Sequence, residues 1–189
     1  MLKFLIGITG ASGSIYGIRL LEELIQKGYE INLIITSAGR EVIKEEIGHS
    51  FIEGFLSKYK YKIKIWDEND YSAPFISGSN SVDYQIIIPC SMGKLSAIAN
   101  GISKNILERS ADVVLKEKKQ LILVVRETPL NLIHLENMLK VAKAGALIVP
   151  AMPAFYHKPE TVDDIVNFLV GKILNLIGIE HNLFKKWKA

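Results

Sequence analysis

Short apolar runs recur along the chain, and each is bounded by glycine, proline or polar residues. Runs of four to eight residues bounded in this way are typical of strands buried in a sheet. The strongest of them are almost continuous in valine, isoleucine and leucine, which is the pattern of a strand covered on both faces. We therefore predict strands at Phe4–Ile6, Glu30–Thr36, Lys62–Trp66, Asp83–Pro89, Gln120–Val125 and Ala146–Val149.

The segments between these runs carry apolar residues at the three- and four-residue spacing of amphipathic helices. In the first such segment, Ile18, Leu21 and Ile25 share one face. This periodicity predicts helices through residues 18–25 and over about 39–46, 95–101, 103–119, 132–144 and 161–177. Because strands and helices alternate, we expect an α/β fold with a doubly wound, mainly parallel sheet that has helices on both faces.

The stretch from Gly48 to Asn80 is the least regular part of the chain. Apart from the strand at Lys62–Trp66, its main feature is the polar segment DENDYSAPFISGSNS, residues 67–81. A loop of this length inside a compact domain is usually functional or mobile.

Length, composition and charge limit the domain number and the partners that can be expected. With 189 residues, 49% hydrophobic and 23% charged, we predict one domain over residues 1–189. The net charge of +3 is small and basic residues are not interleaved with aromatic ones, so no nucleic-acid partner is expected. The longest apolar region, residues 165–179, is interrupted by polar residues, so no membrane span is expected. One cysteine, Cys90, and no signal peptide predict a cytoplasmic protein.

The segment GITGASGSIYG, residues 7–17, joins the first strand to the first helix. Gly7, Gly10 and Gly13 allow a sharp turn and a close approach of a ligand, and Ser12 and Ser14 are both candidate N-caps. The N-terminus of the following helix would present free amides and a positive dipole end to a phosphate. The spacing is neither the dinucleotide fingerprint nor a Walker motif. Two interpretations remain open, a phosphate site and a plain strand-to-helix turn.

Polar residues stand directly after several of the predicted strands. In a doubly wound sheet these strand ends converge on one crevice, where ligands bind. Hydroxyls, backbone amides and an arginine would there meet a ligand that carries phosphate. The residues at these ends are Ser12, Thr36, Ser91, Arg126, Glu127 and Tyr156.

Arg109 and Lys116 are seven residues apart, so they share one helix face and could hold one phosphate. Lys116 also lies near a helix end, where the dipole favours a cation whatever the function, and spacing alone favours this structural role. His134 and His157 have no partners at ligand spacing, so no metal site is expected. Cys90 ends an apolar strand and is interpreted as a buried small hydrophobe rather than a nucleophile.

Several long motifs resemble one known family. GITGASGSIYGIRLLE, SGS at 77–79, PCSMGKLSAIA, ERSADVVLKEKK, VVRETPL and PAFYHKP occur here in the order found in UbiX-type flavin prenyltransferases. The similarity covers nearly the whole chain and is weakest over about residues 48–73. The resemblance implies a Rossmann-like, three-layer protein that transfers a dimethylallyl group from dimethylallyl phosphate to N5 and C6 of reduced FMN. The product, prenylated FMN, would serve a UbiD-type decarboxylase.

The resemblance also assigns residues to the site. It implies catalytic roles for Ser12, Glu46, Lys116 and Glu127. FMN would be held by Gly10, Ala11, Ser12, Gly13, Thr36, Ser91, Met92, Gly93, Lys94 and Arg126. The prenyl phosphate would be held by Glu46, Arg109, Lys116, Tyr156 and Lys172, and Trp187 would lie in a C-terminal tail, about residues 180–189, that closes over the substrate. The site would be built between subunits of a homo-oligomer, usually a dodecamer.

Two residues depart from the family pattern. Lys94 stands where many relatives have threonine, which puts a cation near the expected flavin phosphate, and Lys172 stands where others have arginine. Two alternatives remain beside prenyl transfer. One is an FMN-dependent cysteine decarboxylase of the wider flavoprotein group. The other is a non-catalytic flavin carrier, which would need the glycine turn but not the joint presence of Glu46, Arg109, Lys116, Tyr156 and Lys172.

Overall fold

A six-stranded sheet with the strand order β3-β2-β1-β4-β5-β6 forms the centre of the structure. All neighbouring strands in it are parallel. The structure is a computed structural model that describes residues 2–185 and 187. The strands are β1 Lys3–Ile8, β2 Glu30–Ile35, β3 Ile63–Trp66, β4 Tyr84–Cys90, β5 Gln120–Val125 and β6 Leu147–Ile148. This strand order is that of the Rossmann fold, which confirms the predicted fold class.

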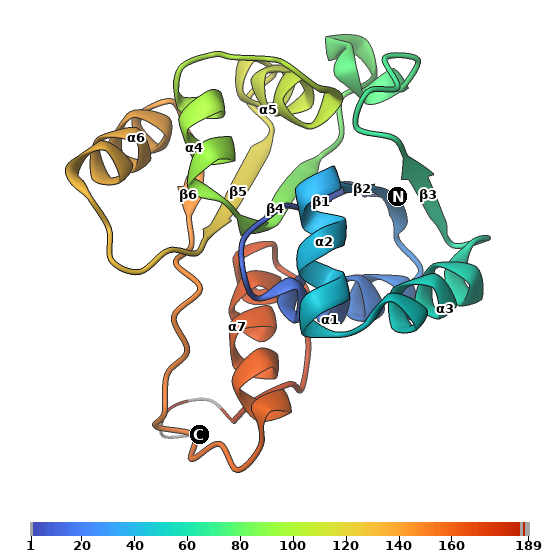
Figure 1. Cartoon of the computed structure of the whole chain (residues 1–189), viewed down its shortest axis with the longest axis vertical. Helices are drawn as coiled ribbons and strands as arrows, with labels where there is room; N and C mark the ends of the chain where they lie inside the picture. The colour runs from blue at the N-terminus through green and yellow to red at the C-terminus, as the bar shows by residue number, and fades with distance from the viewer. Residues whose placement is uncertain (1, 186, 188–189) are drawn as a thin grey trace.

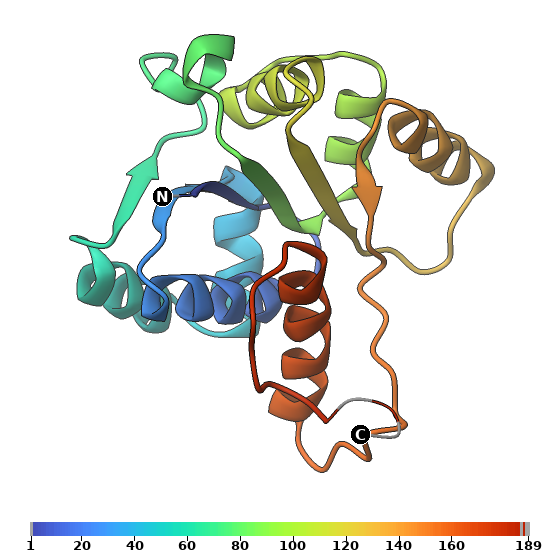
Figure 2. The same cartoon turned by 180° about the vertical axis from the view of Figure 1, so that it is seen from behind.

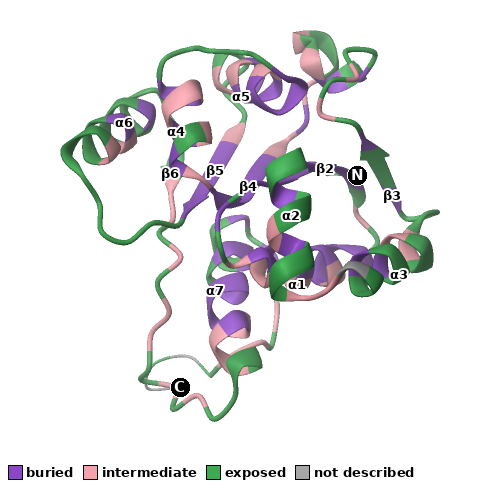
Figure 3. Cartoon of the chain, viewed as in Figure 1, coloured by how far each residue is buried: buried purple, intermediate pink, exposed green. Residues whose placement is uncertain are grey.

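Helices cover both faces of the sheet, so the molecule has three layers (Figure 1). One face carries α1 Ser14–Gln26, α3 His49–Tyr59 and α7 Val162–Leu176, and the other carries α4 Met92–Ala99, α5 Ile106–Lys116 and α6 Leu132–Lys143. Each face has its own cluster of buried apolar residues, and the central strands β1, β2, β4 and β5 are almost wholly buried, whereas the edge strand β3 is partly exposed (Figure 3). The helix α2 Ser37–Glu46 packs beside α1 and α3.

The helix α3 is absent from the sequence prediction. Its apolar residues Ile52, Phe55, Leu56 and Tyr59 have helical spacing and pack on the first face. Gly54 lies in mid-helix and makes the segment look irregular, and tertiary packing overrides its weak helix propensity. The segment between β3 and β4 contains two short 3-10 helices, Pro74–Ile76 and Gly78–Asn80.

Helix starts differ from the predicted ones because side chains cap them. The helix predicted from residue 103 begins at Ile106, since the Asn105 side chain accepts the Glu108 amide hydrogen bond at 3.0 Å. The helix predicted from residue 95 begins at Met92, after the cap Ser91. Both starts lie at the carboxyl edge of the sheet, so the caps fix which amides face that edge.

Part of the chain projects away from the sheet. The first half of α7, the loop 149–161 before it, and residues 180–185 and 187 after it form one protrusion, which we call the arm (Figures 1 and 2). Its aromatic side chains contact each other: Phe168 lies 4.9 Å from Phe184 and 5.1 Å from His157, between ring centroids. Gly171 permits this packing, because a Cβ there would lie 2.6 Å from atoms of His181 and Phe184.

The close contact of α1 with the sheet gives a stability prediction. A Cβ on Gly17 would lie 2.5 Å from the Ile88 carbonyl oxygen, whereas a Cβ on Gly54 of α3 would meet nothing within 4 Å. We expect Gly17→Ala to lower the free energy of unfolding by about 1–3 kcal/mol, because the backbone must shift. Gly54→Ala should raise it by up to about 1 kcal/mol through helix propensity. Urea denaturation of both variants measures this, and equal stability of the two would contradict the packing described.

Candidate functional site

The glycine turn lies at the point where the strand order reverses. The chain leaves β1 through residues 9–13, and β4, the neighbour of β1 on the other side from β2, ends beside it in the Ser91–Lys94 turn. A crevice at this switch point is where open parallel sheets bind ligands. A Cβ on Gly10 would come within 2.6 Å of the Ala38 Cβ, and Gly13 has φ of +101°, so both positions require glycine.

The first helix is capped by a residue from another helix. The Glu46 carboxylate, at the end of α2, accepts hydrogen bonds from the Gly13 amide at 2.9 Å and from the Ser14 amide and hydroxyl at 2.9 and 2.7 Å. The prediction that a serine caps this helix is therefore wrong for Ser14, which is the first helical residue, and for Ser12, since the N-cap is Gly13 without a side-chain bond. A carboxylate at this place satisfies free amides and the positive dipole end together.

Partial burial raises the pKa of Glu46, but hydrogen bonds from Ser12, Ser14 and the Gly13 and Ser14 amides outweigh burial and hold the pKa below its usual value. The group is therefore ionised at neutral pH. Since the folded pKa lies below the unfolded one, the stability from these bonds is present above the unfolded pKa and is lost as the pH falls through the folded one.

The start of α2 is held in a similar way. The Thr36 side chain accepts the Gly39 amide hydrogen bond at 3.1 Å, and the Ser37 amide donates to the Glu68 carboxylate at 2.7 Å. Glu68 lies two residues beyond the end of β3 and also accepts from the Asn105 side-chain amide at 2.9 Å. Thr36 is thus at the carboxyl edge as predicted, with its hydroxyl used as a cap.

The Ser91–Lys94 turn is fastened to the glycine turn by a buried threonine. Thr9 donates its hydroxyl to the Pro89 carbonyl at 2.7 Å and accepts the Ser91 amide at 2.9 Å. The amides of Met92 and Gly93 are in the first turn of α4, so they have no acceptor within that helix. This turn can therefore present two amides and a serine hydroxyl to an anion.

Lys94 is not a free cation. Its ammonium lies 2.6 Å from the Glu108 carboxylate of α5, and these side chains are 20% and 4% exposed. The sequence predicted a positive charge near the flavin phosphate, and the structure shows this charge paired with a buried carboxylate.

Arg126 and Glu127 follow β5 directly and are exposed at the same edge. The Arg126 amide donates to the Cys90 carbonyl at 3.3 Å, so the start of this loop lies beside the end of β4. The Glu127 carboxylate accepts the Thr128 amide at 2.9 Å. An arginine and a carboxylate therefore flank the Ser91–Lys94 turn, which is the position predicted from strand-end convergence.

Arg109 and Lys116 share α5 but lie toward different edges of the sheet. They are seven residues apart, which is about 10 Å along the helix axis. Arg109 pairs with Asp112 at 2.7 Å, and Lys116 pairs with Glu117. Lys116 is near the amino edge, because Lys119, three residues on, pairs with Asp83 just before β4. Within one chain Lys116 is thus remote from the glycine turn.

Tyr156 and Trp187 belong to the arm, and Lys172 lies outside it, in the second half of α7. The ring of Tyr156 lies 5.2 Å from that of Trp187, and Lys172 is exposed on α7. The arm and α5 lie at opposite ends of the molecule in both cartoons (Figures 1 and 2). The structure therefore places the expected FMN residues together at the carboxyl edge. The cations and aromatic residues expected to hold the prenyl phosphate lie in two further groups of the same chain, one on α5 and one on α7 and the arm.

Three polar residues of this edge are missing from the sequence prediction: Thr9, Glu68 and Glu108. Thr9 and Glu68 each follow a strand closely, so strand-end position was a signal for both. Glu108 lies in a helix at a buried position with 4% of its surface exposed, and nothing local in the sequence marks its partner.

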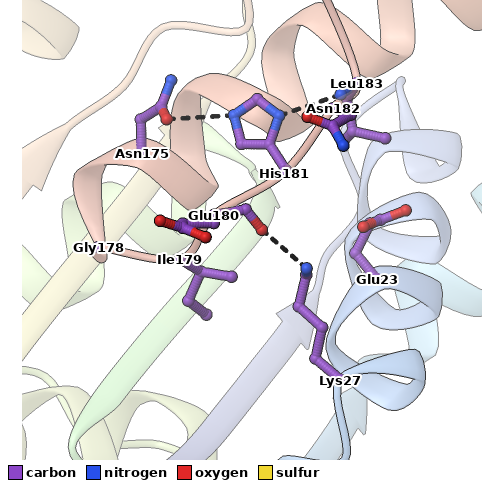
Figure 4. A pocket seen from close by; sticks show the side chains of 9 residues that line it. All are labelled: Glu23, Lys27, Asn175, Gly178, Ile179, Glu180, His181, Asn182 and Leu183. Carbon is purple, nitrogen blue, oxygen red and sulfur yellow. Dashed lines mark hydrogen bonds between the residues drawn. The ribbon is translucent and has the colours of Figure 1, made fainter.

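One cavity lies away from the expected site residues. A cleft of about 720 Å³ lies between the end of α1 and the segment after α7 (Figure 4). Lys27 donates to the Glu180 carbonyl at 2.7 Å, and His181 bonds to Asn175 at 3.2 Å, so these contacts fasten the base of the arm to the body. None of the expected site residues lines this cleft.

Cys90 is fully buried, and burial raises the pKa of its thiol to about 12, so the interpretation as a buried hydrophobe is confirmed. Among residues 2–185 and 187, no cluster of three or more His, Cys, Asp or Glu side chains is placed to hold a metal ion. In the same part of the chain, no helix combines the length and apolarity needed to cross a bilayer.

Comparisons with known proteins agree with this geometry. The profile of the Flavoprotein family matches residues 1–174. A curated relative, the flavin prenyltransferase UbiX of Alkalihalophilus pseudofirmus, is 50% identical over 96% of this chain and 94% of its own. The crystal structure of AnUbiX with FMN and dimethylallyl pyrophosphate has a TM-score of 0.91 and 37% identity, covering 100% of this chain and 98% of that one. A dodecameric FMN-dependent UbiX-like decarboxylase from Escherichia coli O157:H7 has a TM-score of 0.90 and 38% identity, covering 100% of both chains.

Proposed function

This chain belongs to the Flavoprotein family and, within it, to the UbiX flavin prenyltransferases, and we propose that it transfers a dimethylallyl group from dimethylallyl phosphate to N5 and C6 of reduced FMN. The observation that carries the proposal is the placement of the glycine turn beside the Ser91–Lys94 turn at the switch point of the sheet, in a chain half identical to a flavin prenyltransferase. The product is prenylated FMN, and we infer that a UbiD-type decarboxylase receives it.

The residues at the switch point fit FMN. Gly10 and Gly13 allow the tight turn beside which the flavin would lie, and the exposed Ser12 offers a hydroxyl there. The buried Thr36 caps α2 and so fixes the start of that helix beside the turn. The Ser91 hydroxyl, the amides of Met92 and Gly93 and the Arg126 guanidinium suit a phosphate. When bound, reduced FMN supplies the nucleophilic ring atoms of the reaction.

The chain itself must stabilise the leaving phosphate and exclude water. As phosphate leaves an allylic carbon, positive charge develops on that carbon and negative charge on the leaving oxygen. Arg109, Lys116 and Lys172 provide cations for the leaving oxygen, and aromatic faces such as those of Tyr156 and Trp187 shield the allyl cation. Trp187 and the arm would keep water from capturing that cation.

Proton transfer completes the reaction. We assign Ser12 to the vicinity of flavin N5, because it lies in the glycine turn. Glu127 follows β5 at the same edge and can accept the proton that C6 loses when the ring regains aromaticity.

A complete site requires more than one copy of the chain. Lys116 at the amino edge, the arm and the glycine turn cannot surround one substrate while they stay in the positions seen here. We propose a homo-oligomer, with a dodecamer as the expected size, in which α5 and the arm of neighbouring copies approach the glycine turn. We also propose the cytoplasm as its location, where reduced FMN is available.

Anaerobic incubation with reduced FMN and dimethylallyl monophosphate, or the diphosphate in a parallel sample, tests the function. We expect mass spectrometry of the extracted flavin to show an increase of one C5H8 unit, and none when the donor is left out. Unmodified, tightly bound FMN with both donors would favour a flavin carrier. Decarboxylation of a cysteinyl peptide under the same conditions would favour a cysteine decarboxylase.

A further inference from the structure

We propose that Lys94 and Glu108 form a positioning pair, which holds the first turn of α4 so that Ser91, Met92 and Gly93 face the flavin phosphate. This inference rests on the proposed function, since it concerns how the FMN site is held in place. It assigns no direct contact with FMN to Lys94. It makes Glu108, for which the sequence predicted no role, a part of the support of the site.

The pair joins two helices at the edge where FMN is expected. Lys94 is the third residue of α4 and Glu108 the third of α5, so both lie in first turns that face the carboxyl edge. Glu108 is favoured there by the positive dipole end of α5, whereas the dipole of α4 opposes a cation at Lys94. The 2.6 Å contact with a carboxylate that is 4% exposed compensates for this unfavourable position.

Glu108 has a second bond on the same edge. Its other carboxylate oxygen accepts the Lys104 amide at 2.7 Å, so one side chain holds both the loop before α5 and the start of α4. Asn105, which caps α5, continues the connection through its 2.9 Å bond to Glu68. The start of α4 is thus fixed from one side by Thr9 and from the other by this chain of bonds.

Two roles for Lys94 give different results when the charge is removed. If Lys94 were itself a phosphate ligand, Glu108 would only weaken it by neutralising its charge, and Glu108→Gln would leave FMN affinity unchanged or raise it. If the pair positions α4, either single change leaves a partly buried charge without its partner, and α4 shifts. Replacing both groups by apolar ones of similar size removes that cost, and this is often neutral for stability. Lys104 is an exposed residue, so its amide can then bond to water.

The experiment compares Lys94→Met, Glu108→Gln and the double variant Lys94→Met/Glu108→Leu in the full-length protein. FMN affinity is measured by quenching of flavin fluorescence, and thermal denaturation is followed in parallel. We expect each single variant to bind FMN about tenfold more weakly, and the double variant to return to within about threefold of the unaltered protein.

Arg19→Met is the matched control, because Arg19 pairs with Glu23 at 2.6 Å with side chains 24% and 11% exposed, but within α1. It should lower thermal stability and leave FMN affinity unchanged. A double variant as weak as Lys94→Met, or tighter FMN binding by Glu108→Gln, would overturn the positioning role. Failure of the unaltered protein to bind FMN would instead count against the proposed function.

Discussion

A Lys116→Ala variant is expected to bind FMN as the unaltered protein does and to transfer the prenyl group about 100- to 1,000-fold more slowly. The ammonium would stabilise charge on the departing phosphate, and this charge is largest in the transition state. Its loss should therefore appear mainly in kcat. FMN affinity should persist, because Lys116 is near the amino edge and the FMN residues are at the carboxyl edge of the same chain.

Lys119→Ala is the matched control for this variant. Lys119 is a cation near the same end of α5, but it pairs with Asp83 across the start of β4 and β5 at 2.9 Å. We expect near-normal transfer from it, since an exposed ion pair contributes at most about 1 kcal/mol to stability. Anaerobic single-turnover rates, with the flavin analysed by mass, measure both variants. Normal turnover by Lys116→Ala would contradict the catalytic role. It would favour the structural role, in which the lysine only interacts with the helix dipole.

Local periodicity predicted most of the fold correctly. All six strands were found, because buried parallel strands are almost continuous apolar runs that need no distant information. The helix α3 was missed because it is stabilised mainly by tertiary packing, in which Ile52 and Phe55 are buried against the first face of the sheet. Mid-helix Gly54 gave a local signal in the opposite direction.

The sequence predicted those site residues that lie just beyond the end of a strand. Thr36, Ser91 and Arg126 each lie just beyond a strand end, and the parallel sheet brings such ends together. Partners far apart in sequence were not predictable. Glu46 bonds to Gly13, 33 residues away, and Lys94 bonds to Glu108, 14 residues away. Each bond joins the starts or ends of two different helices, and helical or strand periodicity relates only residues within one element.

A Glu46→Gln variant is expected to transfer the prenyl group about 100-fold more slowly, with weaker FMN binding as well. The change keeps the shape of the side chain but removes the negative charge that now accepts from the Gly13 and Ser14 amides. The glycine turn would then be held less firmly, and a neighbouring copy's cations would lose an attracting charge. Glu45→Gln, at the adjacent exposed position of α2, is the control and should retain activity. Loss of activity in both variants alike would point to a general effect of charge on α2.

Mixing the two slow variants tests whether Glu46 and Lys116 meet in one site across a subunit boundary. In an oligomer formed from equal amounts of Lys116→Ala and Glu46→Gln chains, each variant supplies the residue that the other lacks. If one copy contributes Lys116 and its neighbour contributes Glu46, about a quarter of the sites contain both native residues, and about a quarter of the activity should return. If both residues act from the same chain, no site regains the pair and mixing adds nothing. The positions of α5 and the glycine turn within one chain favour the first outcome, because a single copy holds the two residues apart.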